Sequence, residues 1–102
     1  MPARVLDKSA YSAFFRSPLL AHLRERQVRT VVVSGAETDV CVLSTVLDAV
    51  NIGLRVVLVE DALCSSSDPG HDALMTMYRL RYAQQIDLIK MEALPEYWPR
   101  AV

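Results

Sequence analysis

This 102-residue sequence lacks several features, and each absence excludes a class of protein. No apolar run approaches the ~20 residues that a transmembrane helix needs, so we expect no membrane span and no membrane partner. The opening residues, MPARVLDKSAYSAF, contain no long apolar core, and we therefore expect no signal peptide. An excess of basic residues is also missing, since 11 Lys and Arg face 12 Asp and Glu, which argues against a nucleic-acid partner. Cysteine is scarce, and two cysteines without a secretion signal predict reduced thiols in the cytoplasm.

Apolar residues, by contrast, make up 52% of the chain, and the net charge is -1, as in an ordinary globular protein. At this length we expect a single domain over residues 1–102, which buries roughly two-thirds of the surface that the unfolded chain exposes. The apolar segments alternate between short β-branched runs and longer stretches that begin with helix-capping residues. Residues 92–102 are rich in proline and predict no further regular structure. We predict strands at 28–34, 55–60 and 86–89, with 4–6 as the end of an earlier one, and helices from Ser17-Pro18, at about 40–51 and at 68–81.

Strand and helix alternate with short connections, which is typical of an α/β protein with right-handed crossovers and a parallel sheet. The strand at 28–34 is largely apolar on both faces rather than alternating, which favours a sheet covered on both sides. We therefore predict a three-layer, Rossmann-like parallel sheet with helices on both faces. In such sheets the ligand binds beyond the carboxyl ends of the strands, so residues 34–41 and 61–68 are expected to lie at the cleft.

The stretch VVVSGAETDVCVLSTVLDAV, residues 31–50, combines a buried strand, a polar loop and a helix that begins at or just before Cys41. A thiol at a helix N-terminus faces free N–H groups and the positive end of the helix dipole, and both favour the thiolate. Cys41 is therefore the candidate nucleophile, although a cysteine in such a place is otherwise most often a small buried hydrophobe. Cys64 has no comparable surroundings, and we predict that it lies in the core or lines the cleft.

Four segments carry a family resemblance: K-S-A-Y-S-A-F at 8–14, G-A-E-T-D-V-C-V at 35–42, S-T-V-L-D-A-V at 44–50 and G-L-R-V-V-L-V-E-D-A at 53–62. Together they resemble the isochorismatase-like cysteine hydrolase superfamily, whose members include nicotinamidase, N-carbamoylsarcosine amidohydrolase and ureidoacrylate amidohydrolase. The resemblance extends from about Val5 to Ile89. It implies that the protein hydrolyses a C–N bond in a small amide or carbamoyl substrate.

The resemblance also implies roles for individual residues. Cys41 would attack the carbonyl carbon and form a covalent acyl-enzyme, while Lys8 would hold a positive charge near the sulfur. The backbone N–H groups of Glu37 and Cys41 would stabilise the oxyanion. The peptide bond between Ala36 and Glu37 is expected to be cis.

For other side chains, alternatives stay open. Tyr11 and Phe14 are candidates for the substrate pocket, and hydrophobic packing is an equal alternative for both. His71, near a helix start, is predicted to be a surface residue. Neither His71 nor His22 has metal-ligand neighbours, and we expect no bound metal and no cofactor.

The sequence also departs from the family, whose members begin with a strand that ends in a catalytic aspartate. This chain starts just before the lysine, so the resemblance implies an α/β fold that is truncated at its N-terminus. Asp39 is a poor substitute for that aspartate, and so is Asp7, because extended backbone would point Asp7 and Lys8 in opposite directions. The strand at 28–34 would then form an open edge, which favours a homo-oligomer. The alternative is an inactive remnant of such an enzyme that acts only as an oligomerisation or interaction module.

Overall fold

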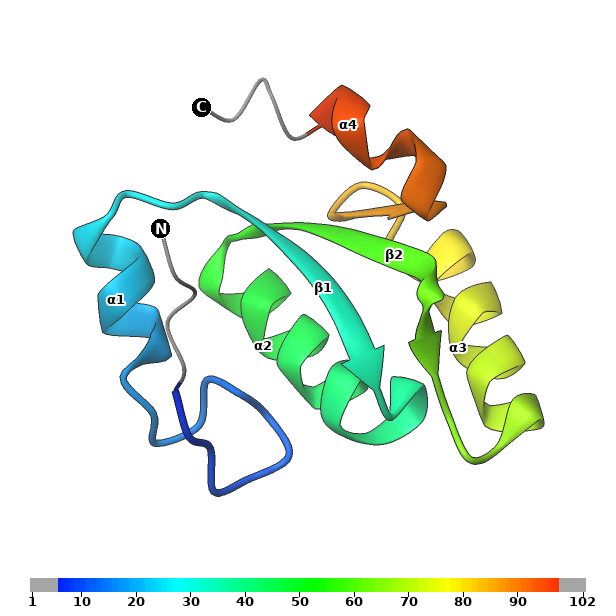
Figure 1. Ribbon diagram of the computed structural model, residues 1–102, viewed down its shortest axis with the longest axis horizontal. Helices are drawn as coiled ribbons and strands as arrows, with labels where there is room; N and C mark the ends of the chain where they lie inside the picture. Colours follow the sequence, from blue (N-terminus) through cyan, green and yellow to red (C-terminus); the bar gives the residue numbers. More distant parts are fainter. Residues whose placement is uncertain (1–5, 98–102) are drawn as a thin grey trace.

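Three parallel strands form the sheet, and their order in space follows their order in the chain (Figure 1). The computed structural model describes residues 6–97. The predicted parallel sheet is confirmed, but the first strand begins and ends later than predicted and the second extends further at its carboxyl end, because Gly35 and Ala36 pair with Leu63 and Cys64. Of the predicted earlier strand, residues 4 and 5 lie outside the described part, and Leu6 belongs to no strand. The strands are β1 (Thr30–Ala36), β2 (Arg55–Cys64) and β3 (Ile86–Ile89).

Three helices accompany the strands: α1 (Leu19–Glu25), α2 (Leu43–Ile52) and α3 (Asp68–Arg81). α3 has the predicted range, because Ser67 caps it by accepting a hydrogen bond from the Gly70 N–H at 3.1 Å and Pro69 stands in its first turn. α2 ends at Gly53, as predicted, and this glycine adopts the left-handed conformation. Its predicted start is wrong, since residues Thr38–Val42 form a π-helical turn, η1, before the regular helix begins. No helix in residues 6–97 is long and apolar enough to cross a membrane.

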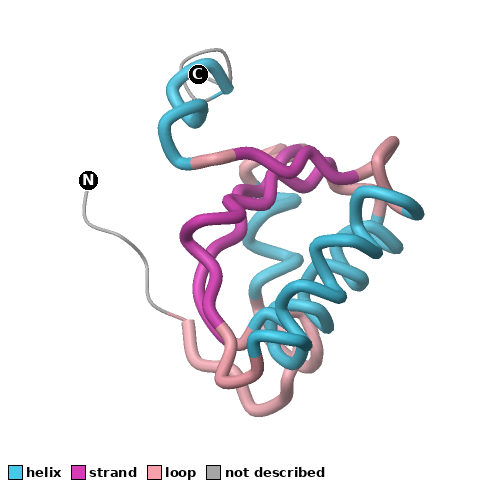
Figure 2. The backbone as a smooth tube through the Cα atoms, turned by 90° about the vertical axis from the view of Figure 1, so that its right-hand side faces the viewer, coloured by secondary structure: helices cyan, strands magenta, loops and turns pink. Residues whose placement is uncertain are grey.

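α2 and α3 pack against the same face of the sheet (Figure 2). Helices on both faces were predicted; α2 and α3 cover one face, and a short helical segment after β3 covers part of the other. Each helix connects one strand to the next strand in the same direction, and crossovers of one hand then place both helices on one side. The sheet and the two helices share a core of fully or nearly buried residues: Val42, Val46, Ala49, Val56, Leu58, Met75, Tyr78 and Ile86.

The second face of the sheet is covered in part, by a short segment that follows β3. One 3-10 turn, η2 (Met91–Ala93), leads into one helical turn, α4 (Leu94–Tyr97). The absence of regular structure predicted for residues 92–102 is therefore wrong up to residue 97, because Pro95 falls in a first helical turn, where no backbone N–H partner is needed. Residues 98–102 lie outside the described part. Ala93 and Leu94 pack against a second cluster, which contains Val57, Val59 and Ile89.

β1 is an edge strand of the sheet that residues 6–97 form. Val31, Val32 and Val33 are only half-buried, whereas the residues of β2 paired with them, from Val56 to Leu58, are almost fully buried. The open edge expected for this strand is therefore present in the described part of the chain. An apolar edge strand offers unpaired backbone groups to another strand.

Candidate active site

A break in the register between β1 and β2 shapes the carboxyl edge of the sheet. Val33 lies opposite Leu58, but Gly35 lies opposite Leu63, so β2 bulges away from β1 between these two positions. Gly35 adopts a φ of +114°, a conformation that favours glycine because side chains rarely tolerate it. Bulges commonly occur beside active sites, where they redirect the chain. Here the bulge lies immediately before the loop that carries the candidate nucleophile.

The loop after β1 places Cys41 in a wide turn at the start of α2. The peptide bond between Ala36 and Glu37 is cis, the geometry that the resemblance implies. The carbonyl oxygen of Glu37 accepts hydrogen bonds from the N–H groups of Val40 and Val42, at 3.1 and 3.0 Å. These donors flank Cys41 in the sequence and close a π-helical turn, which explains why the regular helix starts later than predicted. The Cys41 thiol is half-buried.

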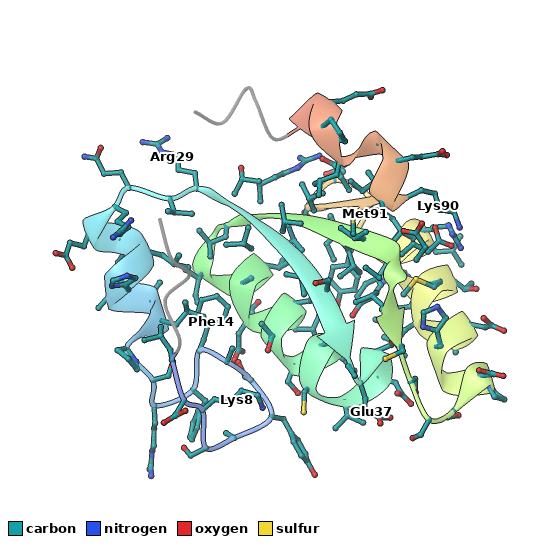
Figure 3. The ribbon with its side chains drawn as sticks, viewed as in Figure 1. Lys8, Phe14, Arg29, Glu37, Lys90 and Met91 are labelled. Carbon is teal, nitrogen blue, oxygen red and sulfur yellow. The ribbon has the colours of Figure 1, made fainter. Side chains whose placement is uncertain are left out.

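Lys8 reaches the same part of the molecule from the N-terminal loop (Figure 3). Its ammonium group donates to the carbonyl oxygens of Ala10 at 2.7 Å and Tyr11 at 3.3 Å, so the loop holds its lysine in place. A hydrogen bond from the Ala13 N–H to the Thr45 hydroxyl, 2.9 Å long, ties this loop to α2. An open cleft of about 620 Å³ results, and its lining comprises Lys8, Ser9, Ala10, Tyr11 and Cys41.

The two aromatic candidates differ in position. Tyr11 lines the cleft and is 66% exposed. Phe14 is not among the residues that line this cleft; it packs against the core and lies between α1 and α2 (Figure 3). The structure therefore brings Lys8, Tyr11 and Cys41 together and leaves Phe14 among the hydrophobic residues.

A run of serines in the second crossover anchors the loop that carries Cys41. The Ser66 N–H and hydroxyl donate to one carboxylate oxygen of Glu37 at 2.9 and 2.7 Å, and the Ser65 hydroxyl donates to Asp39 at 2.7 Å. The hydrogen bonds from Ser66, its backbone N–H first, lower the pKa of the Glu37 carboxyl. Glu37 is therefore ionised at neutral pH and accepts both bonds. The sequence placed this serine run at the same edge of the sheet but did not show which side chains it would hold.

Two residues outside the cleft lie elsewhere than predicted. His71 is half-buried rather than a surface residue, because its Nδ1 atom is hydrogen-bonded to the Thr38 hydroxyl at 2.8 Å. Cys64 is exposed, neither in the core nor among the residues that line the cleft. It ends β2 opposite Ala36, beyond the bulge and at the open carboxyl edge of the sheet. Among residues 6–97, no cluster of three or more His, Cys, Asp or Glu side chains is arranged to hold a metal ion.

The fold and the site thus define an α/β protein with a cysteine and a lysine in one cleft at the carboxyl edge of a parallel sheet. A family model described as the isochorismatase domain matches residues 2–90, which is most of the chain. The protein belongs to the isochorismatase family. Among curated relatives, the ureidoacrylate amidohydrolase of Cronobacter sakazakii is 36% identical over 88 residues, covering 86% of this chain and 33% of the relative.

Solved structures carry the same arrangement of strands and helices. An isochorismatase family protein from Desulfovibrio vulgaris superposes with a TM-score of 0.84 at 30% identity, covering 98% of this chain and 53% of that one. The nicotinamidase from Staphylococcus aureus superposes with a TM-score of 0.73 at 32% identity, covering 76% of this chain and 51% of that one. The chain therefore spans about half the length of these two solved relatives, and a third of the amidohydrolase.

Proposed function

We propose that this protein is a cysteine hydrolase that cleaves the C–N bond of a small amide or carbamoyl compound. The observation that carries the proposal is the shared cleft of Cys41 and Lys8, which come from segments far apart in the sequence. Membership of the isochorismatase family supports the reaction class, because relatives include an amidohydrolase and a nicotinamidase. The open cleft faces solvent and has room for a small substrate.

In the proposed mechanism, the Cys41 sulfur attacks the carbonyl carbon and forms a tetrahedral intermediate. The backbone N–H groups of Glu37 and Cys41 donate to the oxyanion, and one such donor typically lowers a barrier by roughly 3–4 kcal/mol. The C–N bond then breaks, and the nitrogen leaves with a proton as ammonia or an amine. Water attacks the remaining thioester, releases the acid and restores the thiol. Lys8 supports the first step, because its positive charge favours the thiolate.

The mechanism also needs a group that carries protons, and the lining residues within 6–97 include no carboxylate. Asp39 belongs to the same turn as Cys41, but its carboxylate already accepts the hydrogen bond from Ser65. We therefore propose that a carboxylate from another segment or a second chain takes up the thiol proton and later activates water. Without it, the thioester is expected to form faster than it is hydrolysed.

Alkylation by iodoacetamide at pH 7 tests the nucleophile, with Cys64 as an internal control. Cys64 is exposed and Cys41 is half-buried, so accessibility alone predicts that Cys64 reacts first. The proposed function predicts the opposite order, with Cys41 slowed about tenfold by Lys8→Ala, the effect of one nearby charge on thiol ionisation. Lys90→Ala removes a lysine charge of the same kind just after β3, and it should leave the alkylation rates of both cysteines unchanged. Peptide mass spectrometry over time gives both rates, and a Cys41 rate at or below that of Cys64 contradicts the proposal.

A second candidate function is an interaction module without catalysis, and the open β1 edge favours it. We propose in either case that a second copy of the chain covers this edge and forms a homo-oligomer. Size-exclusion chromatography with light scattering should then give a dimer or larger species. Val32→Lys should shift it toward monomer, because a charge on an edge strand opposes pairing. A stable wild-type monomer across concentrations contradicts the oligomer.

The two candidates differ in turnover. The hydrolase should release ammonia from nicotinamide or ureidoacrylate at high protein concentration, the compounds on which two named relatives act. The interaction module should release none.

The cytoplasm remains the expected compartment, since both cysteines are free thiols.

A further inference from the structure

Three consecutive side chains of the loop before Cys41 each meet a partner in the second crossover. Glu37 is held by Ser66 and Asp39 by Ser65, and both of these contacts lie at partly or fully exposed positions. Thr38, between them, is completely buried, and its hydroxyl lies 2.8 Å from Nδ1 of His71. The central contact is therefore the one whose loop side chain is completely buried.

The N-terminus of α3 lies directly against this loop. At Gly70, an added Cβ atom would lie 2.2 Å from a carboxylate oxygen of Asp39, so any other residue would require the Asp39 side chain to move. His71 is the next residue, and its backbone N–H donates to the Ser67 carbonyl in the first turn of the helix. The imidazole therefore projects from a rigid element that is already in contact with the loop.

Thr38 begins the turn in which Cys41 stands. The turn is closed by the hydrogen bond from Val42 to Glu37, so a displacement of Thr38 displaces the segment between these residues as a unit. That segment includes the thiol of Cys41 and the N–H groups assigned to the oxyanion. A shift of about 1 Å in such a group can lower an enzymatic rate on the order of a hundredfold.

We propose that His71 is a positioning residue for Cys41, which acts through its hydrogen bond to Thr38. The proposal rests on the proposed function, because it requires a reactive Cys41. The competing explanation is structural: His71 satisfies a buried hydroxyl and contributes to stability only. The two explanations differ in whether the reactivity of Cys41 changes when the folded state is preserved.

The iodoacetamide rates of Cys41 and Cys64 separate these explanations when they are measured in the same molecules. His71→Leu should lower the Cys41 rate roughly two- to tenfold, the size that one net hydrogen bond implies, and leave the Cys64 rate unchanged. His71→Asn should retain the wild-type rate, because an asparagine side-chain atom takes the place of Nδ1. His71→Gln, whose amide takes the place of the other ring nitrogen, should behave like His71→Leu.

Thr38→Val keeps the shape of the buried side chain and removes only the hydroxyl, so it tests the same bond if His71→Leu does not fold. It should lower the Cys41 rate as His71→Leu does, and the double variant should show no further loss. Urea unfolding accompanies each measurement. If His71→Leu and Thr38→Val lose stability but keep the wild-type alkylation rate of Cys41, the positioning role of His71 is overturned and the proposed hydrolase function is unaffected. A wild-type Cys41 that reacts no faster than Cys64 overturns the proposed function, and His71 then has no nucleophile to position.

Discussion

Replacing Cys41 with alanine is expected to lower amide hydrolysis by at least about 10³-fold, the usual consequence of removing a nucleophile that forms a covalent intermediate. The physical reason is that the hydroxyls and the ammonium of the other described lining residues are far weaker nucleophiles at neutral pH than a thiol. The cleft is lined by a lysine ammonium, a serine, an alanine, a tyrosine and the thiol. The lysine is bonded to carbonyl oxygens of its own loop, so it is not aimed at a carbonyl carbon as an attacking amine.

The measurement is ammonia release from the compounds named above, at matched protein concentration. Cys64→Ala is the matched control, because it removes the more exposed thiol and should leave the rate unchanged. Cys41→Ser should also be inactive, since an alcohol is far less ionised than a thiol at neutral pH. In wild-type protein incubated with substrate, mass spectrometry should show the acyl group on the peptide that contains Cys41. Hydrolysis that survives Cys41→Ala would remove the cysteine from the mechanism.

The sequence predicted the parts of the site that depend on local pattern. Cys41 and Lys8 were placed by motifs, and the loop at the carboxyl end of β1 followed from the order of strand and helix. Gly53 was recognised as a helix end because its role is local as well. The turn at Thr38–Val42 was not foreseen, since one hydrogen bond to Glu37 decides between a regular helix and a π-helical turn.

The parts that could not be predicted depend on which distant residues meet. The contact between Thr38 and His71 joins two crossovers, and it requires the approach that Gly70 allows. That α2 and α3 share one side of the sheet depends on strand order, which apolar runs alone do not specify. The exposure of Cys64 follows from the bulge in β2, because the register after a bulge no longer obeys simple alternation.

The site and the edge share one property, because each is open in the part of the chain that the structure describes. The cleft lacks a carboxylate in its lining, and β1 lacks a neighbour on one side within the described residues. The loop that carries Cys41 starts at the end of β1, the edge strand of the described sheet. A single additional strand beside β1 would therefore cover the edge and reach the cleft. Catalysis and assembly are then expected to respond together when a second chain binds.

The second large effect is expected in the core, where Leu58→Ala should destabilise the fold by about 2–5 kcal/mol. Leu58 is completely buried on β2, the central strand, and packs with residues of both α2 and α3. Its removal leaves a cavity that sheet and helices cannot readily fill, because interior packing is close. A domain of this size has a total stability of only about 5–15 kcal/mol, so a large share would be lost. Urea unfolding followed by circular dichroism measures the change.

Tyr78→Phe is the matched control for that experiment, and it should not destabilise the protein. Tyr78 is 1% exposed in the same core, and its hydroxyl has no hydrogen-bond partner among the described residues. Burial, followed by the neighbouring Tyr82, raises the pKa of Tyr78 to about 12, so the phenol is neutral in the folded state. Burying an unpaired hydroxyl costs about 1–3 kcal/mol, and its removal should leave the free energy of unfolding unchanged or raise it. A loss of more than about 1 kcal/mol on Tyr78→Phe would mean that the hydroxyl has a partner. The contrast between the two variants therefore separates the cost of an apolar cavity from that of a buried polar atom within one core.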